Sequence, residues 1–194
     1  MNASDVGRIA DLEETTVTGW TNRGVLMAQA DGTYAVIDAL RFAAVGSLVK
    51  AGVPVYRAAE AVAWLEKRRE WYLLFRDSAG KVYDRVKEPF TPDGTTPLMR
   101  FSDESKEHYY VYVVQYSSSL GIQVFGYAGD PVAADRFIEE RLAEPTAGER
   151  IGQGEDSAPA YPNAEDAPAY RVVRYDIGPD LRFALREIEK CTAL

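Results

Sequence analysis

Apolar residues recur three and four positions apart over the first third of the chain, the spacing of helices with one buried face. The pattern predicts short helices over 5–10 and 13–22, a third that begins at Asp38, and a fourth that begins near Pro54. Between the second and third helices, Asp31-Gly32 separates two short segments, 25–29 and 33–36, that can pair as a hairpin. The predicted order is helix, helix, two-stranded hairpin, helix, helix.

The hydrophobic period shortens to two after residue 70, which indicates strands. Segments 71–76 and 81–86 flank a Ser-Ala-Gly turn and predict a hairpin, while 98–101 is a further short strand. Aromatic and β-branched residues predict strands over 108–116 and 122–127. Asp130 then caps a helix over 131–142. We therefore expect an antiparallel sheet of four or five strands with one helix laid across a face.

The remaining chain divides into a tether and a docking segment. Residues 145–169 are acidic, rich in Pro, Ala and Gly, and poor in apolar residues, so we expect a flexible linker. Residues 170–194 predict a strand over 171–176 and a helix from Pro179, which dock on the sheet domain or on another chain. The overall prediction is an α+β fold, with a helical module over 3–69 and a sheet domain over 71–144.

Composition narrows the class of protein. The chain has 194 residues, a net charge of −8 and one cysteine, with no apolar run long enough to cross a membrane and no signal peptide pattern. A single cysteine excludes an internal disulfide and a thiolate metal cluster. We expect a cytoplasmic protein without membrane contact.

Two motifs in the N-terminal module carry a family resemblance. The segment 17–26 runs from a helix with Trp20 into Arg23-Gly24-Val25-Leu26, and an acidic residue, Asp38, opens a helix that Ala51-Gly52 ends before Pro54. With the predicted order of elements, these motifs resemble the DNA-binding domain of the MerR family, a winged helix-turn-helix, over residues 3–69.

The resemblance implies a DNA-binding transcriptional regulator whose second helix enters the major groove and whose wing contacts the neighbouring backbone. By position, the residues implied in binding double-stranded DNA are Thr15, Thr16, Thr18, Asn22, Arg23 and Tyr34. Hydroxyl and amide groups suit both phosphate and base-edge contacts, and Tyr34 would donate to a phosphate from the returning strand of the wing. Such a regulator acts as a homodimer, with the sheet domain supplying dimerisation or signal input.

The charge pattern leaves a second interpretation open. The predicted recognition helix starts with Glu13-Glu14, and the predicted wing has neither lysine nor arginine. Because DNA binding depends on cations facing phosphates, the module can instead serve protein interaction or assembly, as a phage-type packaging component or as an acidic antagonist, without binding DNA.

Other chemistry is sparse, and we expect no enzyme, metal or cofactor. The chain has one histidine, His108, and one cysteine, Cys191, and it lacks a phosphate-binding glycine loop. In the strand over 108–116, Tyr110, Tyr112 and Tyr116 share one face. That face is the sheet core under the helix over 131–142, a partner surface or a small-molecule pocket.

Overall fold

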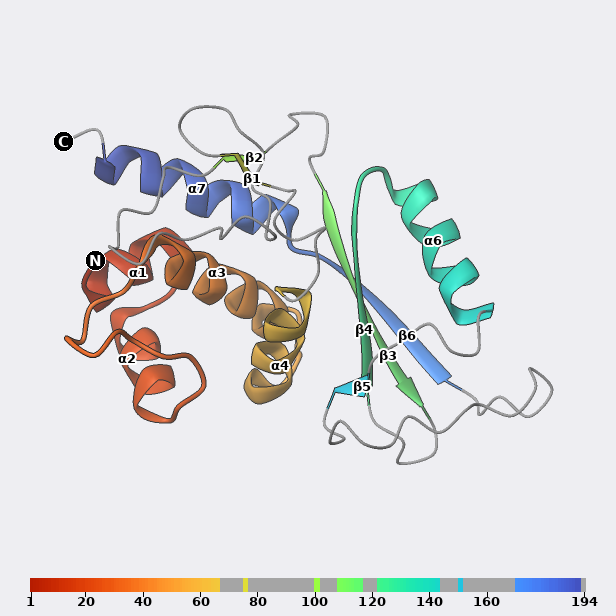
Figure 1. Cartoon of the computed structure of the whole chain (residues 1–194), viewed down its shortest axis with the longest axis horizontal. Coiled ribbons are helices and arrows are strands. Elements are labelled where there is room, and N and C mark those ends of the chain that lie inside the picture. Colours follow the sequence, from red (N-terminus) through yellow and green to blue (C-terminus); the bar gives the residue numbers. More distant parts are fainter. Residues whose placement is uncertain are drawn as a thin grey trace.

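The computed structural model describes residues 1–66, 75–76, 100–101, 108–116, 122–143, 150–151 and 170–192. Figure 1 shows a four-stranded antiparallel sheet with helix α6 (Pro131–Ala143) against one face and a group of helices against the other. The fold is α+β, as the hydrophobic pattern predicts. None of the helices in these ranges is both long and apolar enough to cross a membrane.

Helices α1 (Ala3–Ala10) and α2 (Glu14–Asn22) form the start of the helical layer. The side chain of Asn2 caps α1, since its oxygen accepts a hydrogen bond from the Asp5 N–H at 2.8 Å. The Asp5 carboxylate in turn accepts a hydrogen bond from the Asn2 N–H. Gly24, at φ 68°, follows α2 in the left-handed conformation that glycine tolerates. Both predicted helices are present, with α1 beginning two residues before and α2 one residue after the predicted start.

Helices α3 (Val36–Lys50) and α4 (Val55–Leu65) complete the N-terminal layer. The third helix begins two residues before the predicted start, because Asp38 occupies the third helical position and accepts the Ala35 N–H at 2.8 Å. Gly52, at φ 93°, follows the end of α3, and Pro54 is the N-terminal cap residue of α4. The glycine and the proline thus separate these helices as the sequence predicts.

The predicted wing hairpin is wrong in detail. Residues 25–29 and 33–35 form no strand, and Val36 belongs to α3. One hairpin-like bond remains, from the Gln29 N–H to the Thr33 carbonyl at 2.8 Å, and the Asp31 carboxylate accepts the Thr33 N–H across the turn. Asp31-Gly32 therefore makes a tight turn, but the residues on either side of it do not pair as strands, and α3 begins at the last residue of the predicted second strand.

The sheet has the strand order β5–β4–β3–β6. Strands β3 (Tyr109–Tyr116) and β4 (Ile122–Ala128) confirm the two strongest predicted strands, and β6 (Tyr170–Asp176) pairs antiparallel with β3. Val113 lies opposite Val124 on one side and Val173 on the other. The fourth strand, β5 (Arg150–Ile151), pairs with the start of β4.

Strand β5 corrects the prediction of an uninterrupted tether over 145–169, since residues 150–151 form a ladder with β4. Most of the predicted linker, 145–149 and 152–169, lies outside the described residues. A second small sheet joins β1 (Phe75–Arg76) to β2 (Arg100–Phe101). The predicted partner of the first strand, 81–86, also lies outside the described residues.

Helix α6 covers one face of the sheet. Asp130 caps it, with one carboxylate oxygen accepting the N–H groups of Val132 and Ala133 at 3.0 Å each. Beneath α6 lies a cluster of buried side chains from β3, β4 and α6: Tyr110, Tyr112, Val114, Phe125, Ala134 and Ile138. The predicted helix across a face of the sheet is therefore present.

The larger core lies on the opposite face and joins the two ends of the chain. Helix α7 (Gly178–Thr192) follows β6 and packs against α1 and α3. Its buried face is the one that the sequence predicts, Leu181, Ala184, Leu185 and Ile188. The same cluster includes Tyr109, Val111 and Val124 of the sheet, so the N-terminal helices, the sheet and α7 share one core.

Candidate nucleic-acid interface

Helix α2 presents one face to solvent and one face to the core. Thr15, Thr18 and Asn22 are exposed, Thr16 is half-buried, and Arg23 is exposed directly after the helix. On the inward face, Val17 and Trp20 are buried, and the Trp20 ring stacks on Phe42 of α3 with centroids 6.1 Å apart. Thr15, Thr18, Asn22 and Arg23 are therefore exposed to solvent, whereas Thr16 lies at the border between the exposed and the buried face.

Tyr34 does not join this surface, and its predicted phosphate contact is wrong. The residue is 6% exposed, and its ring packs edge-on against Phe42 at 5.7 Å. Thr21 Oγ1 donates to the Val17 carbonyl at 3.0 Å, so the Tyr34 hydroxyl donates to Thr21 Oγ1 at 2.9 Å. A tyrosine on a short loop above an apolar helix buries its ring and satisfies its hydroxyl locally.

Ion pairs occupy most cations of the N-terminal helices. The pairs are Arg8–Asp5, Arg41–Asp38, Arg41–Glu66, Lys50–Asp11 and Arg57–Glu60. Arg23 forms none of these pairs; its Nε donates to the Gly19 carbonyl at 3.1 Å. The charge along α2 thus changes from negative at its start, at Glu13 and Glu14, to positive at its end, at Arg23. Among residues 1–66, Arg23 has no carboxylate partner.

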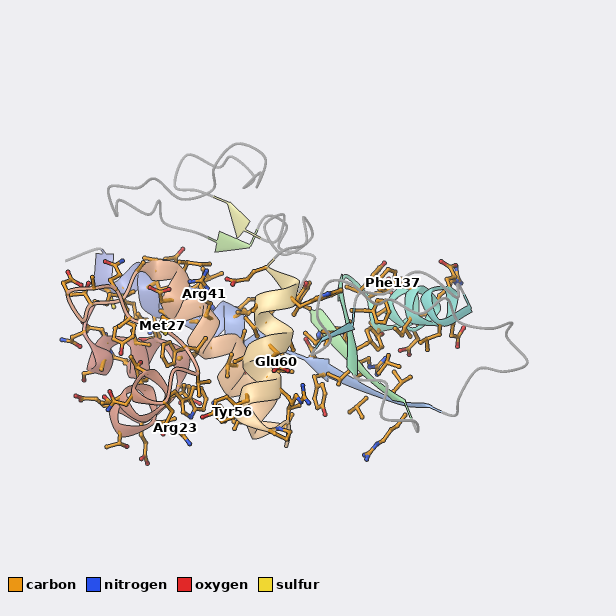
Figure 2. The ribbon with its side chains drawn as sticks, turned by 60° about the horizontal axis from the view of Figure 1, so that its bottom comes forward. Arg23, Met27, Arg41, Tyr56, Glu60 and Phe137 are labelled. Atoms are coloured by element: carbon orange, nitrogen blue, oxygen red, sulfur yellow. The ribbon has the colours of Figure 1, made fainter. Side chains whose placement is uncertain are left out.

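Two exposed side chains of α4 were not singled out from the sequence. Tyr56 and Arg57 lie in the first turn of α4, and Tyr56 is 53% exposed. Figure 2 shows Arg23 and Tyr56 on the same edge of the helical layer. Tyr56 follows Val55 and therefore looks like part of an apolar run in the sequence. Only its position outside the buried stripe of α4 could have identified it as exposed.

A groove of about 350 Å³ lies between the loop after α2 and helices α3 and α4. Val25, Leu26, Met27 and Ala28 line one side, and Ala59, Val62 and Ala63 of α4 line the other. Met27 is 72% exposed, the highest exposure among the large apolar side chains of the described residues. The groove is therefore largely apolar at its walls and open at its rim.

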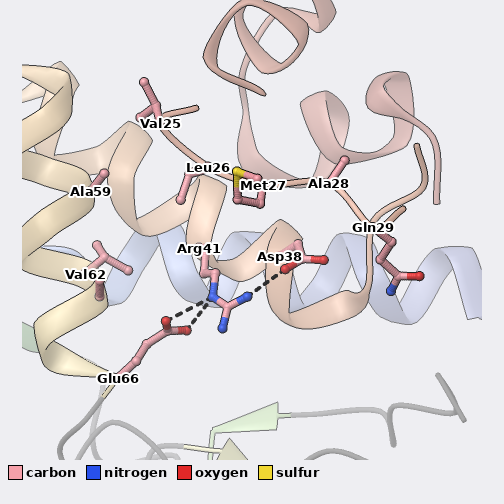
Figure 3. Close-up of a pocket in the computed structure, with 11 residues that line it drawn as sticks. Val25, Leu26, Met27, Ala28, Gln29, Asp38, Arg41, Ala59, Val62 and Glu66 are labelled. Carbon is pink, nitrogen blue, oxygen red and sulfur yellow. Dashed lines mark hydrogen bonds and ion pairs between the residues drawn. The ribbon is translucent and has the colours of Figure 1, made fainter. Parts of the chain in front are cut away.

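Arg41 forms the polar part of the groove, between two carboxylates (Figure 3). It donates to Asp38 at 2.7 Å and to both Glu66 oxygens at 2.8 and 3.0 Å. Burial lowers the pKa of the Arg41 guanidinium, but Glu66 and then Asp38 outweigh burial, and the pKa lies above its ordinary value. The network ties the start of α3 to the end of α4.

The tyrosine-rich face of β3 is core. Tyr110 and Tyr112 lie beneath α6, and Tyr112 is 1% exposed. The Tyr112 hydroxyl donates to Asp135 of α6 at 3.1 Å, and Arg174 of β6 donates to both oxygens of the same carboxylate at 2.7 Å. Burial, followed by the bond to Asp135, raises the pKa of Tyr112 to about 12. The side chain of Tyr116 lies outside the described part.

His108 precedes β3 and pairs through Nδ1 with the Asp176 carboxylate at the end of β6. The other Asp176 oxygen accepts the N–H groups of Tyr109 and Gly178 at 3.2 and 3.1 Å, so Asp176 joins β3 to the start of α7. Over the described residues, no three His, Cys, Asp or Glu side chains are grouped to hold a metal ion. The His108–Asp176 pair thus has a structural role at the strand-helix junction.

No model of a known protein family matches the chain, and no curated protein matches it.

Proposed function

We propose that the protein binds double-stranded DNA through the exposed face of α2 and acts as a transcriptional regulator. In this proposal, residues 3–69 are a MerR-like helix-turn-helix in which the wing is reduced to a turn. The observation that carries the proposal is the outward face of α2, where the exposed residues Thr15, Thr18 and Asn22 lead to Arg23, which has no carboxylate partner in the described part of the chain. The remaining cations of the N-terminal helices are held by carboxylates.

The chemistry of this face suits a groove contact. Threonine and asparagine side chains donate and accept hydrogen bonds and can contact base edges or phosphate oxygens. In this proposal Arg23 supplies a guanidinium for a phosphate, and Tyr56, which is exposed, donates to a second phosphate of the backbone. The carboxylates of Glu13 and Glu14 at the start of α2 repel phosphates. The C-terminal half of α2 should therefore approach the duplex most closely, and binding should centre on Thr18, Asn22 and Arg23.

The test measures fluorescence anisotropy of a pool of random-sequence duplexes over a series of salt concentrations. Arg23→Ala should weaken binding by roughly tenfold and lower the salt slope by about one. A Thr15→Ala/Thr18→Ala double variant should weaken binding and reduce sequence preference in selected duplexes. Arg186→Ala is the matched control, since it removes the same charge from α7, which lies beyond α1 and α3 from α2 in Figure 1.

Two results would contradict DNA binding through α2. One is an affinity that is equal for the wild type, Arg23→Ala and the threonine double variant. The other is binding that Arg186→Ala weakens as much as Arg23→Ala does, because that pattern would indicate dependence on net charge alone.

A second candidate function is protein interaction, favoured by the apolar groove under Met27 and the chain's net charge of −8. Large exposed apolar side chains at the rim of a groove are typical of partner sites. The discriminating variant is Met27→Glu, which places a charge on the groove and leaves the outward face of α2 intact. A purified partner that binds the wild type and Arg23→Ala equally but loses Met27→Glu would support this function over DNA binding.

A further inference from the structure

The outer edge of β6 has hydrogen-bonding groups that no described strand satisfies. The sheet order places β6 at one edge with seven residues, whereas the other edge strand, β5, has two. An edge strand presents a row of backbone N–H and C=O groups to any strand that can lie beside it. Long, regular edges of this kind are sites where another strand adds to the sheet.

The register identifies which groups point outward. The Ile177 N–H donates to the Tyr109 carbonyl at 2.9 Å, and the β3–β6 pairing continues in regular register from Tyr110↔Asp176 to Tyr116↔Tyr170. Because antiparallel pairs alternate, odd-numbered residues of β6 bond to β3 and even-numbered residues point away. The outward groups in the middle of the strand therefore belong to Val172 and Arg174, and no strand in the described part of the chain lies beside them on that edge.

We propose that β6 pairs antiparallel with β6 of a second copy of this chain, which joins the two sheets across a two-fold axis at Val173. A two-fold axis normal to the sheet keeps every side chain on the same face of the sheet. Because opposed residues of an antiparallel pair also share a face, one residue must lie opposite its own copy, with the axis between the two. Val173 is the midpoint of β6, so this register overlaps all seven residues. Val172 then exchanges both backbone bonds with Arg174 of the other copy.

The charges of β6 suit this register. Arg174 faces Val172 of the second copy, Arg171 faces Tyr175, and Asp176 faces Tyr170, so no like charges are directly opposed. Asp135 already neutralises Arg174 on the α6 side of the sheet. Figure 1 shows α6 against one face of the sheet and α4 and α7 toward the other, so the described helices flank the faces of the sheet.

The inference rests on and deepens the proposed DNA binding, since one α2 helix with a single arginine, Arg23, gives little phosphate contact and two copies double it. The pairing itself is measured without DNA, so its failure and the failure of DNA binding are distinguishable.

The experiment measures the mass of the full chain in solution by light scattering after size exclusion. The wild type should be a dimer. Val173→Lys and Val173→Asp should each be monomeric, because the substituted residue faces its own copy at the axis, and an equal mixture of the two should recover a dimer. Far-UV circular dichroism establishes that each variant is folded. Recovery in the mixture is a gain that general destabilisation cannot produce.

A second measurement decides the register and does not depend on a charged variant folding. In a Cys191→Ser background, Val173→Cys should crosslink to a dimer under mild oxidation. Non-hydrogen-bonded antiparallel pairs have Cα atoms about 4.5 Å apart, within the range that a disulfide spans. Val132→Cys, on the exposed start of α6, is the control and should stay monomeric. A monomeric wild type, a dimer that both charged variants keep, or Val173→Cys without crosslinking would overturn the proposal.

Discussion

The hydroxyl of Tyr34 lies 2.9 Å from Thr21 Oγ1 and joins the turn after α2 to the inward side of that helix. This bond completes a short chain in which Thr21 donates to the Val17 carbonyl. The tyrosine ring, packed on Phe42, fixes the turn over the start of α3. Tyr34 therefore fixes the turn that follows α2 through its ring and its hydroxyl.

Replacing Tyr34 by phenylalanine should lower the free energy of unfolding by about 1 kcal/mol, because one partly buried hydrogen bond is lost while the ring stays packed. Affinity for duplex DNA should be unchanged. Urea unfolding gives the stability and anisotropy gives the affinity. A variant of wild-type stability with weakened binding would instead assign the hydroxyl to a phosphate.

Gly126 of β4 should not tolerate a side chain. A Cβ at this position would lie 2.3 Å from the Tyr109 hydroxyl oxygen and 2.8 Å from Leu65 Cδ2, so strand and helix would have to separate. Gly126→Ala should destabilise the protein by about 1–3 kcal/mol in chemical denaturation.

Gly19→Ala is the matched control for that substitution. Its Cβ would meet nothing within 4 Å, and Gly19 lies inside α2. The variant should gain about 0.5–1 kcal/mol, since alanine orders a helix at lower entropic cost. Equal effects of the two alanines would show that β4 and α4 are not packed as closely as described.

Half-buried and exposed ion pairs on the N-terminal helices should contribute differently to the free energy of unfolding. Asp38 accepts the Ala35 N–H at the start of α3 and holds the half-buried Arg41, so Asp38→Ala should cost about 1–3 kcal/mol. Arg57–Glu60 is exposed on α4, and Glu60→Ala should change stability by less than about 0.5 kcal/mol. Thermal or urea unfolding of both variants measures the contrast, and a Glu60→Ala loss as large as that of Asp38→Ala would contradict it.

Tyr112 should make stability fall at alkaline pH. Its pKa in the folded protein is raised to about 12, so the folded state holds a proton that the unfolded chain releases near its ordinary value of 10. The stabilisation is complete below about pH 10 and is lost as the pH rises towards about 12. Unfolding measured across this window should show a steeper decline for the wild type than for Tyr112→Phe. Parallel declines would remove Tyr112 as the cause.

Local signals in the sequence located most of the described elements. Apolar spacing placed α1 to α4, α6 and α7, and residues such as Asp130 and Gly52 set their ends through caps and a left-handed backbone. The aromatic and β-branched runs placed β3 and β4. These features depend on neighbours within a few positions, which a sequence displays directly.

The candidate site was only partly predictable, because some of its features depend on residues that are not neighbours in the sequence. Exposure of Thr15, Thr18, Asn22 and Arg23 follows from the buried stripe of Val17 and Trp20 on one helix. The burial of Tyr34 depends on Phe42, and the groove under Met27 depends on side chains of α4 from Ala59 onward, which lie more than thirty residues away in the sequence. Such contacts have no local pattern.

The sequence by itself determined the α+β composition of the chain, the positions of its helices and main strands, and the polar outer face of α2. Only the tertiary structure decided that the residues after α2 form a turn without strands, that Arg150–Ile151 adds to the sheet, and that α7 crosses back to pack on α1 and α3. Secondary structure follows from periodicity and caps along the chain. Partners across the core are chosen by which apolar faces and backbone edges meet once the chain is folded, and sequence distance does not encode that choice.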